Sequence, residues 1–195
     1  MFIKKKICDE LSDNQIVILS LADIDYFLCL YDRYEQRLLR YIKRIYKPED
    51  EQAMDILQDA FIKIWQNLND FDQSMKLSNW IYRIVHNETI SHWRYNKSYG
   101  KYRKVKLNNI SAGNPMDDFG TNEDKDKKEF QTHEILELLP IKYRTVLVLK
   151  FMEGMSYQEI SDVLKIPEGT VATRINRAKK KFVKMASDKN ISFFD

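Results

Sequence analysis

The stretch SYQEISDVLKIPEGTVATRINRAKKKF, residues 156–182, is the most informative about the fold of the second half of the chain. Ser156 and Glu159 form the Ser-x-x-Glu pattern of a capping box, which predicts the first turn of a short helix. The segment KIP (165–167) predicts a tight turn into a last helix over about 167–185, since proline is well tolerated at the first helical position. Two short helices joined by such a turn, the second of them basic, are typical of a helix-turn-helix.

The expected last helix separates into two faces. Its apolar residues recur at spacings of four, three and four, which predicts a buried stripe. The stripe consists of Val171, Ile175, Ala178 and Phe182. The remaining face is basic, because the segment 173–184 contains no acidic residue.

This basic face is a candidate for reading DNA. Arginine can bind guanine through two hydrogen bonds, and lysine suits phosphate oxygens. The alternative from the residues alone is a solvated basic face in an ordinary helical bundle. The candidate DNA contacts are Thr170, Thr173, Arg174, Arg177, Lys180 and Lys181.

Ahead of this block, the sequence predicts further helices and one long linker. HEILELL (133–139) ends at Pro140, and a helix over 141–153 stops at Gly154, a residue type favoured just past a helix end. Residues 98–130 are largely polar, which favours a flexible, largely unstructured linker over an ordered loop.

The amino-terminal part is predicted to hold three helices, over about 13–46, 50–69 and 77–97. Apolar side chains at helical spacing mark the first of them. They are Phe27, Leu30, Tyr34, Leu38, Tyr41 and Ile45. This helix is expected to end at Lys47-Pro48, because the residue before a proline is pushed out of the α-helical region.

The composition favours long helices. The 195 residues include only 5 glycines and 4 prolines, which argues against a turn-rich β fold. Every apolar run is shorter than the roughly 20 residues that cross a bilayer, and the start of the chain lacks the pattern of a signal peptide. We therefore expect an all-α, cytoplasmic protein without membrane insertion. Its two small helical domains would be 1–97 and 131–195, joined by the linker 98–130.

No enzyme signature is found. Cys8 and Cys29 stand far apart, without a Cys-x-x-Cys or Cys/His cluster, so we expect two reduced thiols rather than a disulfide or a metal site. The sequence also lacks a glycine-rich phosphate loop, a serine elbow and paired Glu-x-x-His motifs. We expect no catalytic residue, no metal and no cofactor.

The block 139–182 resembles region four of bacterial sigma factors. The matching residues are Leu139, Pro140, Tyr143, Arg144, Leu147, Leu149, Tyr157, Glu159, Ile160, Gly169, Thr170, Val171, Arg174, Arg177 and Ala178. The resemblance implies binding to the minus-thirty-five promoter element and to the flap of the polymerase β subunit. Luminescence-type response regulators share a similar helix-turn-helix, so a DNA-binding regulator with a helical sensor domain is an alternative on this block alone.

Two amino-terminal segments carry an independent resemblance. DILQDAFIKIW (55–65) resembles sigma region 2.2, which docks on the clamp helices of the polymerase β′ subunit. NWIYRIVHNETISHWR (79–94) resembles regions 2.3 and 2.4, which melt and read the minus-ten element. No region 1.1 or full region three fits around them, which indicates the extracytoplasmic-function (ECF) group. The implied partners are core RNA polymerase, promoter DNA and an anti-sigma factor.

On the expected second helix, four residues share the face opposite the apolar stripe. They are Asp55, Gln58, Asp59 and Ile62. An acidic face that includes an isoleucine suits a basic protein partner, although an ordinary acidic surface is the alternative from the residues alone. The resemblance implies that this face binds core polymerase.

On the expected third helix, five residues recur at spacings of three, four, four and three. They are Trp80, Arg83, Asn87, Ser91 and Arg94. By family position, Asn87 and Ser91 line a pocket for a flipped minus-ten base, a step that costs unstacking energy. Arg83 and Arg94 would hold phosphates, and Trp80 is shared between this role and core packing.

Three positions depart from the family pattern. Ala172 stands where the family usually has lysine or arginine, so one DNA contact is expected to be missing. Lys165 stands where many relatives have a turn glycine, which implies a modest strain or a different turn. Glu88 puts an acidic group beside the proposed DNA face.

Overall fold

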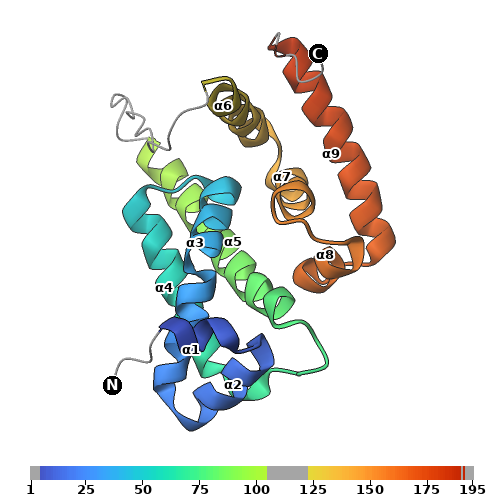
Figure 1. The fold of residues 1–195 in the computed structure, drawn as a ribbon. Coiled ribbons are helices and arrows are strands. Elements are labelled where there is room, and N and C mark those ends of the chain that lie inside the picture. Colours follow the sequence, from blue (N-terminus) through green and yellow to red (C-terminus); the bar gives the residue numbers. More distant parts are fainter. Residues whose placement is uncertain (1–4, 105–122, 190, 192–195) are drawn as a thin grey trace.

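The computed structural model describes residues 5–104, 123–189 and 191, and every regular element in these ranges is a helix (Figure 1). The elements are α1 (Lys5–Glu10), α2 (Asp13–Ala22), η1 (Ile24–Tyr26), α3 (Phe27–Tyr46), α4 (Asp50–Gln66), η2 (Leu68–Asp70), α5 (Leu77–Lys104), α6 (Glu123–Leu138), α7 (Ile141–Leu147), η3 (Val148–Met152), α8 (Tyr157–Leu164) and α9 (Glu168–Asp188). The prediction of an all-α protein is confirmed. We call α1 to α5 the amino-terminal unit and α6 to α9 the carboxy-terminal unit.

In the amino-terminal unit, α3, α4 and α5 all pack against one another. The stripe predicted on the first helix lies inside this bundle. Leu30, Tyr34, Leu38, Tyr41 and Ile45 are buried, and Phe27 is half-buried. Helix α3 ends at Lys47, whose backbone is left-handed with a φ of 54°, because the residue before a proline does not continue a helix.

The prediction of a single helix over 13–46 is wrong. The chain forms α2 and α3, separated by the 3-10 turn η1. Asp23 between them has an extended backbone, and its side chain accepts a hydrogen bond from the Asp25 N–H at 3.0 Å. A short carboxylate offers the backbone this alternative to a helical bond, which explains a break inside an otherwise apolar, helix-like stretch.

Helices reach into both ends of the predicted linker. Helix α5 continues to Lys104, beyond the end predicted near Lys97, and α6 begins at Glu123. The stretch EDKDKKE (123–129) consists mostly of good helix formers, with opposite charges four positions apart, and these favour a helix. The rest of the predicted linker, residues 105–122, lies outside the described residues.

Cys8 and Cys29 are joined in a disulfide, so the prediction of two reduced thiols is wrong. Helix α1 folds back to the start of α3 and brings the two Cα atoms to 5.2 Å, within the range that a disulfide needs. Arg33 ties the same region together. Its guanidinium donates to Asp13 Oδ1 at 2.6 Å and to the carbonyls of Cys8 and Leu11 at 2.6 and 2.8 Å.

In the carboxy-terminal unit, the predicted helix-turn-helix is confirmed. Both bonds of the capping box are present: the Ser156 N–H donates to Glu159 Oε2 at 2.7 Å, and the Glu159 N–H donates to Ser156 Oγ at 3.1 Å. Val171, Ile175 and Ala178 are buried. Lys165 adopts a left-handed backbone with a φ of 51°, the conformation for which glycine is better suited.

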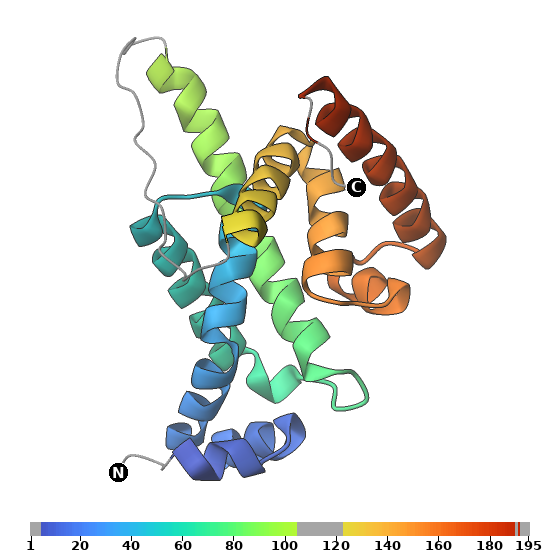
Figure 2. The same cartoon turned by 45° about the horizontal axis from the view of Figure 1, so that its top comes forward.

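The two units pack against each other through α5 with α8 and α3 with α7. Their buried apolar residues form one continuous core. Helix α9 lies at the edge of the molecule away from α3 and α4 in both ribbon views (Figures 1 and 2), so its polar face is left to solvent. No helix in the described ranges is long and apolar enough to span a membrane.

Candidate nucleic-acid and polymerase interfaces

The basic face of α9 is open to solvent. Thr173, Arg177, Lys180 and Lys181 are exposed, and Thr170 and Arg174 are partly exposed. The structure therefore brings all six predicted residues to one accessible side of one helix. The Thr173 hydroxyl donates to the Gly169 carbonyl at 2.9 Å, which fixes this side chain against the first turn of α9.

An open pocket of about 380 Å³ lies at the start of α9. Its lining comes from two helices and consists of Lys142, Tyr143, Gly169, Thr170, Thr173, Arg174 and Arg177. Four of the predicted DNA contacts are among them. With three cations and several hydroxyl groups, the pocket suits an anionic ligand such as a phosphate group.

Sequence reasoning missed the contribution of α7 to this surface. Lys142 Nζ lies 5.2 Å from the centre of the Tyr143 ring, and Lys181 Nζ lies 5.9 Å from it. The Tyr143 ring thus lies close to one cation of α7 and one cation of α9. The adjacent basic and aromatic residues after Pro140 are the only signal in the sequence, and that signal does not reveal that α7 packs against α9.

The predicted stripe on α5 is accessible only in its second half. Asn87, Ser91 and Arg94 are exposed and Arg83 is partly exposed, whereas Trp80 is buried. The Trp80 ring packs against Phe71 at 5.3 Å between centroids. The four polar residues form a continuous surface, and Trp80 anchors its buried end.

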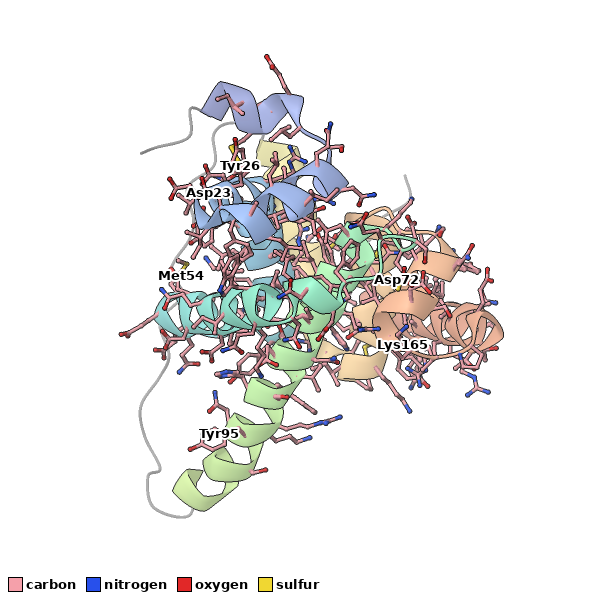
Figure 3. The ribbon with its side chains drawn as sticks, turned by 90° about the horizontal axis from the view of Figure 1, so that it is seen from below. Asp23, Tyr26, Met54, Asp72, Tyr95 and Lys165 are labelled. Carbon is pink, nitrogen blue, oxygen red and sulfur yellow. A yellow bond between two sulfur atoms is a disulfide. The ribbon has the colours of Figure 1, made fainter. Side chains whose placement is uncertain are left out.

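Aromatic side chains stand near this stripe. Trp93 is partly exposed and carries Lys97 Nζ 4.8 Å above its ring. Tyr95, labelled in Figure 3 on the part of α5 that extends beyond the other helices, is 59% exposed. Exposed aromatic rings beside cations are the elements on which single-stranded bases stack.

An ion pair and a hydrogen bond connect α5 to α4. Glu88 Oε2 lies 2.7 Å from Lys63 Nζ, so the acidic residue beside the proposed DNA face is paired with a cation of the neighbouring helix. His92 Nε2 lies 3.2 Å from Asp59 Oδ2. These contacts link the two helices that carry candidate binding residues.

The predicted polymerase face of α4 is exposed along its whole length. Asp55, Gln58, Asp59 and Ile62 are all accessible, and Ile62 is 54% exposed. Trp65 lies one turn beyond Ile62 and is 36% exposed, with its ring 5.2 Å from that of Phe27. Sequence reasoning missed Trp65, which extends the apolar part of this face.

A second exposed apolar pair lies on the carboxy-terminal unit. Phe151 and Val183 are 58% and 55% exposed. Lys179, one turn before Val183 on α9, places its Nζ 5.0 Å from the centre of the Phe151 ring. Phe151 of η3 and Val183 of α9 are therefore both open to solvent, and nothing in the sequence pattern singled them out.

Among the described residues, no group of three or more His, Cys, Asp or Glu side chains is arranged to hold a metal ion.

Comparison with known protein families identifies the family to which this architecture belongs. Residues 30–99 match the family model of sigma-70 region 2, and residues 129–182 match that of sigma-70 region 4. The chain is 34% identical over 175 residues to the ECF RNA polymerase sigma factor SigW of Bacillus subtilis, which covers 86% of this chain and 92% of the relative. It is 27% identical over 185 residues to the ECF RNA polymerase sigma-E factor of Escherichia coli, over 88% and 93% of the two chains.

Solved structures share the fold. CnrH, in a complex with the cytosolic domain of CnrY, superposes with a TM-score of 0.66 at 22% identity, over 89% of this chain and 96% of CnrH. The sigma factor RpoE of Bartonella quintana, in a complex with the anti-sigma factor NepR, gives a TM-score of 0.65 at 20% identity, over 83% and 96%.

The chain belongs to the extracytoplasmic-function group of the sigma-70 family. Its function is promoter-specific initiation of transcription. The expected resemblance is confirmed in both halves of the chain and in the predicted order.

Proposed function

We propose that three separate surfaces of this chain divide the work of a sigma factor. The basic face of α9 reads the minus-thirty-five element, the exposed stripe of α5 binds the melted minus-ten element, and the acidic face of α4 docks on the β′ clamp helices of core RNA polymerase. The domains 1–97 and 131–195 would carry these surfaces on either side of the linker 98–130. No bond is made or broken in this function.

The observation that best supports this proposal is that the basic face of α9 points outward beside a cationic pocket. Arg174 and Arg177, close to the start of the helix, are suited to base edges in a major groove. Lys180 and Lys181 lie further along, where they suit the phosphate backbone. We add Lys142 and Tyr143 to this surface, since they complete the wall of the pocket.

The minus-ten surface is proposed on α5. Asn87 and Ser91 are exposed polar groups between two arginines, which supports a pocket for a flipped base with phosphate contacts on both sides. The arginines are Arg83 and Arg94. Because Trp80 is buried against Phe71, we assign it the role of holding the start of α5 in place beside this pocket.

The polymerase surface is proposed on α4. Two exposed carboxylates, Asp55 and Asp59, flank Gln58 and lead to the exposed Ile62. A charged rim beside an apolar anchor is the usual composition of a protein interface. The exposed apolar residues Phe151 and Val183 are our candidate contacts for the β flap, because apolar side chains left open to solvent can mark a protein-binding surface.

Regulation by an anti-sigma factor in the cytoplasm completes the proposal. The relatives CnrH and Bartonella RpoE were solved with CnrY and NepR bound, and NepR is an anti-sigma factor. A protein of this kind would hold the chain away from polymerase until a signal releases it.

In vitro transcription with purified core polymerase and a pool of genomic promoter fragments tests the function. We expect specific transcripts that require the chain and that decrease strongly with the Asp55→Ala/Asp59→Ala variant. The matched control is Asp9→Ala/Glu10→Ala, which removes the same charge from two other exposed positions. If no transcripts form while the chain binds duplex DNA tightly without polymerase, the repressor-type alternative holds instead.

A further inference from the structure

The Cys8–Cys29 disulfide joins the first helix to the start of α3. Helix α1 lies at the end of the bundle where α3 begins (Figures 1 and 2), and the two residues are 8% and 1% exposed. They are the only cysteines of the chain. Transcription takes place in the cytosol, where thiols are kept reduced, and a disulfide in that compartment is usually transient and redox-sensing. This bond is therefore a candidate for a reversible link rather than a permanent one.

Hydrogen bonds hold the two cysteines together independently of the sulfur atoms. Arg33, one turn after Cys29 on α3, donates to the Cys8 carbonyl at 2.6 Å. The same guanidinium pairs with Asp13 Oδ1 at 2.6 Å, and Asp13 Oδ2 accepts a hydrogen bond from the Tyr34 hydroxyl at 2.6 Å. We call Asp13, Arg33 and Tyr34 the clamp. Because the clamp does not involve sulfur, it keeps the two thiols close after reduction, and thiols held in this way react as an intramolecular pair.

The residues around Cys29 also support the proposed polymerase face of α4. Phe27, two positions before Cys29, has its ring centre 5.2 Å from that of Trp65. Tyr31, two positions after Cys29, has its ring centre 4.7 Å from that of Phe61. In the part of the chain that the structure describes, the N-cap tyrosine makes no side-chain capping bond to α3, so the first turn of this helix depends on tertiary links such as the disulfide. The bond is thus placed to hold the aromatic contacts beside the apolar end of the α4 face.

We propose that Cys8 and Cys29 form a thiol–disulfide switch that exchanges with a low-molecular-weight thiol and its disulfide, and that sets the affinity of the chain for core polymerase. The effect on polymerase rests on the proposed function of α4. In the oxidised chain the bond fixes the start of α3, so Phe27 and Trp65 stay packed and the apolar end of the α4 face is presented. In the reduced chain this turn is freer, and the face is correctly formed in a smaller fraction of molecules, which weakens binding in proportion.

Reduction proceeds in two exchange steps. The thiolate of a small thiol attacks the sulfur of Cys8, the more exposed of the two residues, the S–S bond breaks, and Cys29 leaves as a thiolate that takes up a proton. A second small thiolate attacks the small-thiol sulfur of the mixed disulfide, which releases Cys8 as a thiolate that is also protonated, and forms the small-molecule disulfide. Two electrons thus pass from two small thiols to the protein, and oxidation is the reverse.

Glutathione buffers test the exchange. The full chain is equilibrated at several ratios of reduced to oxidised glutathione, quenched with acid, alkylated with iodoacetamide under denaturing conditions, and analysed by mass spectrometry. We expect the same oxidised fraction from either starting state. Arg33→Ala should shift the midpoint about tenfold toward oxidised glutathione, because a weaker clamp lowers the effective concentration of one thiol at the other. Tyr34→Phe, a milder change, should shift it in the same direction.

The matched control for the clamp is Arg40→Ala, which replaces an exposed arginine of the same helix and should leave the midpoint unchanged. A disulfide that does not re-form after reduction would overturn the switch. Equal midpoints for Arg33→Ala and Arg40→Ala would overturn it as well, since the clamp would then not hold the thiols together.

Binding to fluorescein-labelled core polymerase tests the consequence. We expect the oxidised chain to bind about fivefold more tightly than the reduced chain, as for a face that is correctly formed in about one fifth of the reduced molecules. Cys8→Ser/Cys29→Ser should bind like the reduced chain at every glutathione ratio, which controls for effects of the buffer on polymerase itself. Circular dichroism of each form confirms that it retains its helices.

The two proposals fail in different ways. If both redox forms bind polymerase equally while Asp55→Ala/Asp59→Ala weakens the binding, the proposed function of α4 stands and the switch fails. If the disulfide exchanges reversibly but Asp55→Ala/Asp59→Ala leaves polymerase binding unchanged, the redox pair stands and the proposed docking face fails.

Discussion

At the scale of single residues, Arg144 illustrates how a family match can have a structural role. Its guanidinium donates to the carbonyls of Leu136 and Glu137 at the end of α6, and to that of Leu139 just past it. A fourth bond reaches the Ile45 carbonyl of α3 at 2.8 Å. The last carbonyls of a helix have no partner within it, so one side chain satisfies the end of α6 and ties it to the other unit.

Replacing this guanidinium should destabilise the whole molecule. We expect Arg144→Ala to lower the free energy of unfolding by about 2–4 kcal/mol, because buried carbonyls lose a charged donor. Arg144→Lys should recover little of this lost stability, since one ammonium group cannot make the several hydrogen bonds of the planar guanidinium. Urea unfolding measures both variants, and Arg177→Ala on the exposed face serves as the control. A change below about 0.5 kcal/mol for Arg144→Ala, the usual range for surface substitutions, would contradict this role.

His86 makes the stability of the fold dependent on pH. Burial, with a smaller contribution from Arg94, lowers the pKa of His86 to about 4, and its Nδ1 lies 2.9 Å from the Tyr41 hydroxyl. The unfolded chain, with a histidine pKa near 6.5, binds more protons than the folded chain between these two values. Stability should therefore be complete above about pH 6.5 and be lost as the pH falls toward 4.

We expect the free energy of unfolding to fall by roughly 2 kcal/mol between pH 7.5 and pH 5. Urea unfolding at both values measures this difference. Glu159, with its pKa at about 2, stays ionised in the folded chain throughout this window. The control is His86→Gln. In this variant, most of the difference in the free energy of unfolding between the two pH values should disappear, whether or not the substitution itself changes stability. An equal pH dependence in both proteins would disprove the assignment to His86.

At the scale of elements, the sequence pattern predicted helices and faces well but not their partners. The buried stripe of α9 and the capping box of α8 follow from spacing within one helix, and local spacing is written in the sequence. The break at Asp23 was missed because the competing hydrogen bond of its side chain leaves no periodic signal. The disulfide was missed because it depends on α1 folding back toward α3.

Reduction of the Cys8–Cys29 disulfide should loosen the start of the amino-terminal unit. The bond closes a loop of 21 positions, for which the loss of unfolded-state entropy corresponds to about 3 kcal/mol. We expect dithiothreitol to lower the urea midpoint of the unmodified chain and to leave Cys8→Ser/Cys29→Ser unchanged. Equal midpoints for the reduced and the oxidised chain would show that the bond does not contribute to stability.

Across the molecule, the cationic face of α9 points outward, whereas the carboxylates of Glu137, Glu153 and Glu159 pair with cations of the amino-terminal unit. Figure 2 shows α9 on the outer edge and α7 between it and α5. Opposite charges are thus separated on the two sides of one small unit. Binding through the outer face should release counterions from DNA and should therefore depend steeply on salt.

The salt dependence of promoter binding can be assigned to single lysines. We expect Lys180→Ala to reduce the slope of log K against log salt by about 1, because one phosphate contact is lost. Lys179→Ala is a matched control, since the Lys179 side chain lies over the Phe151 ring on another side of α9. Polymerase–promoter complexes titrated at several salt concentrations provide the slopes. Equal slopes for both variants would contradict the assignment of Lys180 to the DNA surface.

Residue spacing was enough to predict the helical class, the helix-turn-helix and the exposed faces of α4 and α9, because these depend on spacing within one helix. Three features could be seen only in the packed molecule: Trp80 is buried, α7 completes the pocket beside α9, and Glu153 lies beside cations of the other unit. Each of these features joins residues from helices that are separate in the chain. Such contacts depend on how the helices pack, which no local periodicity encodes.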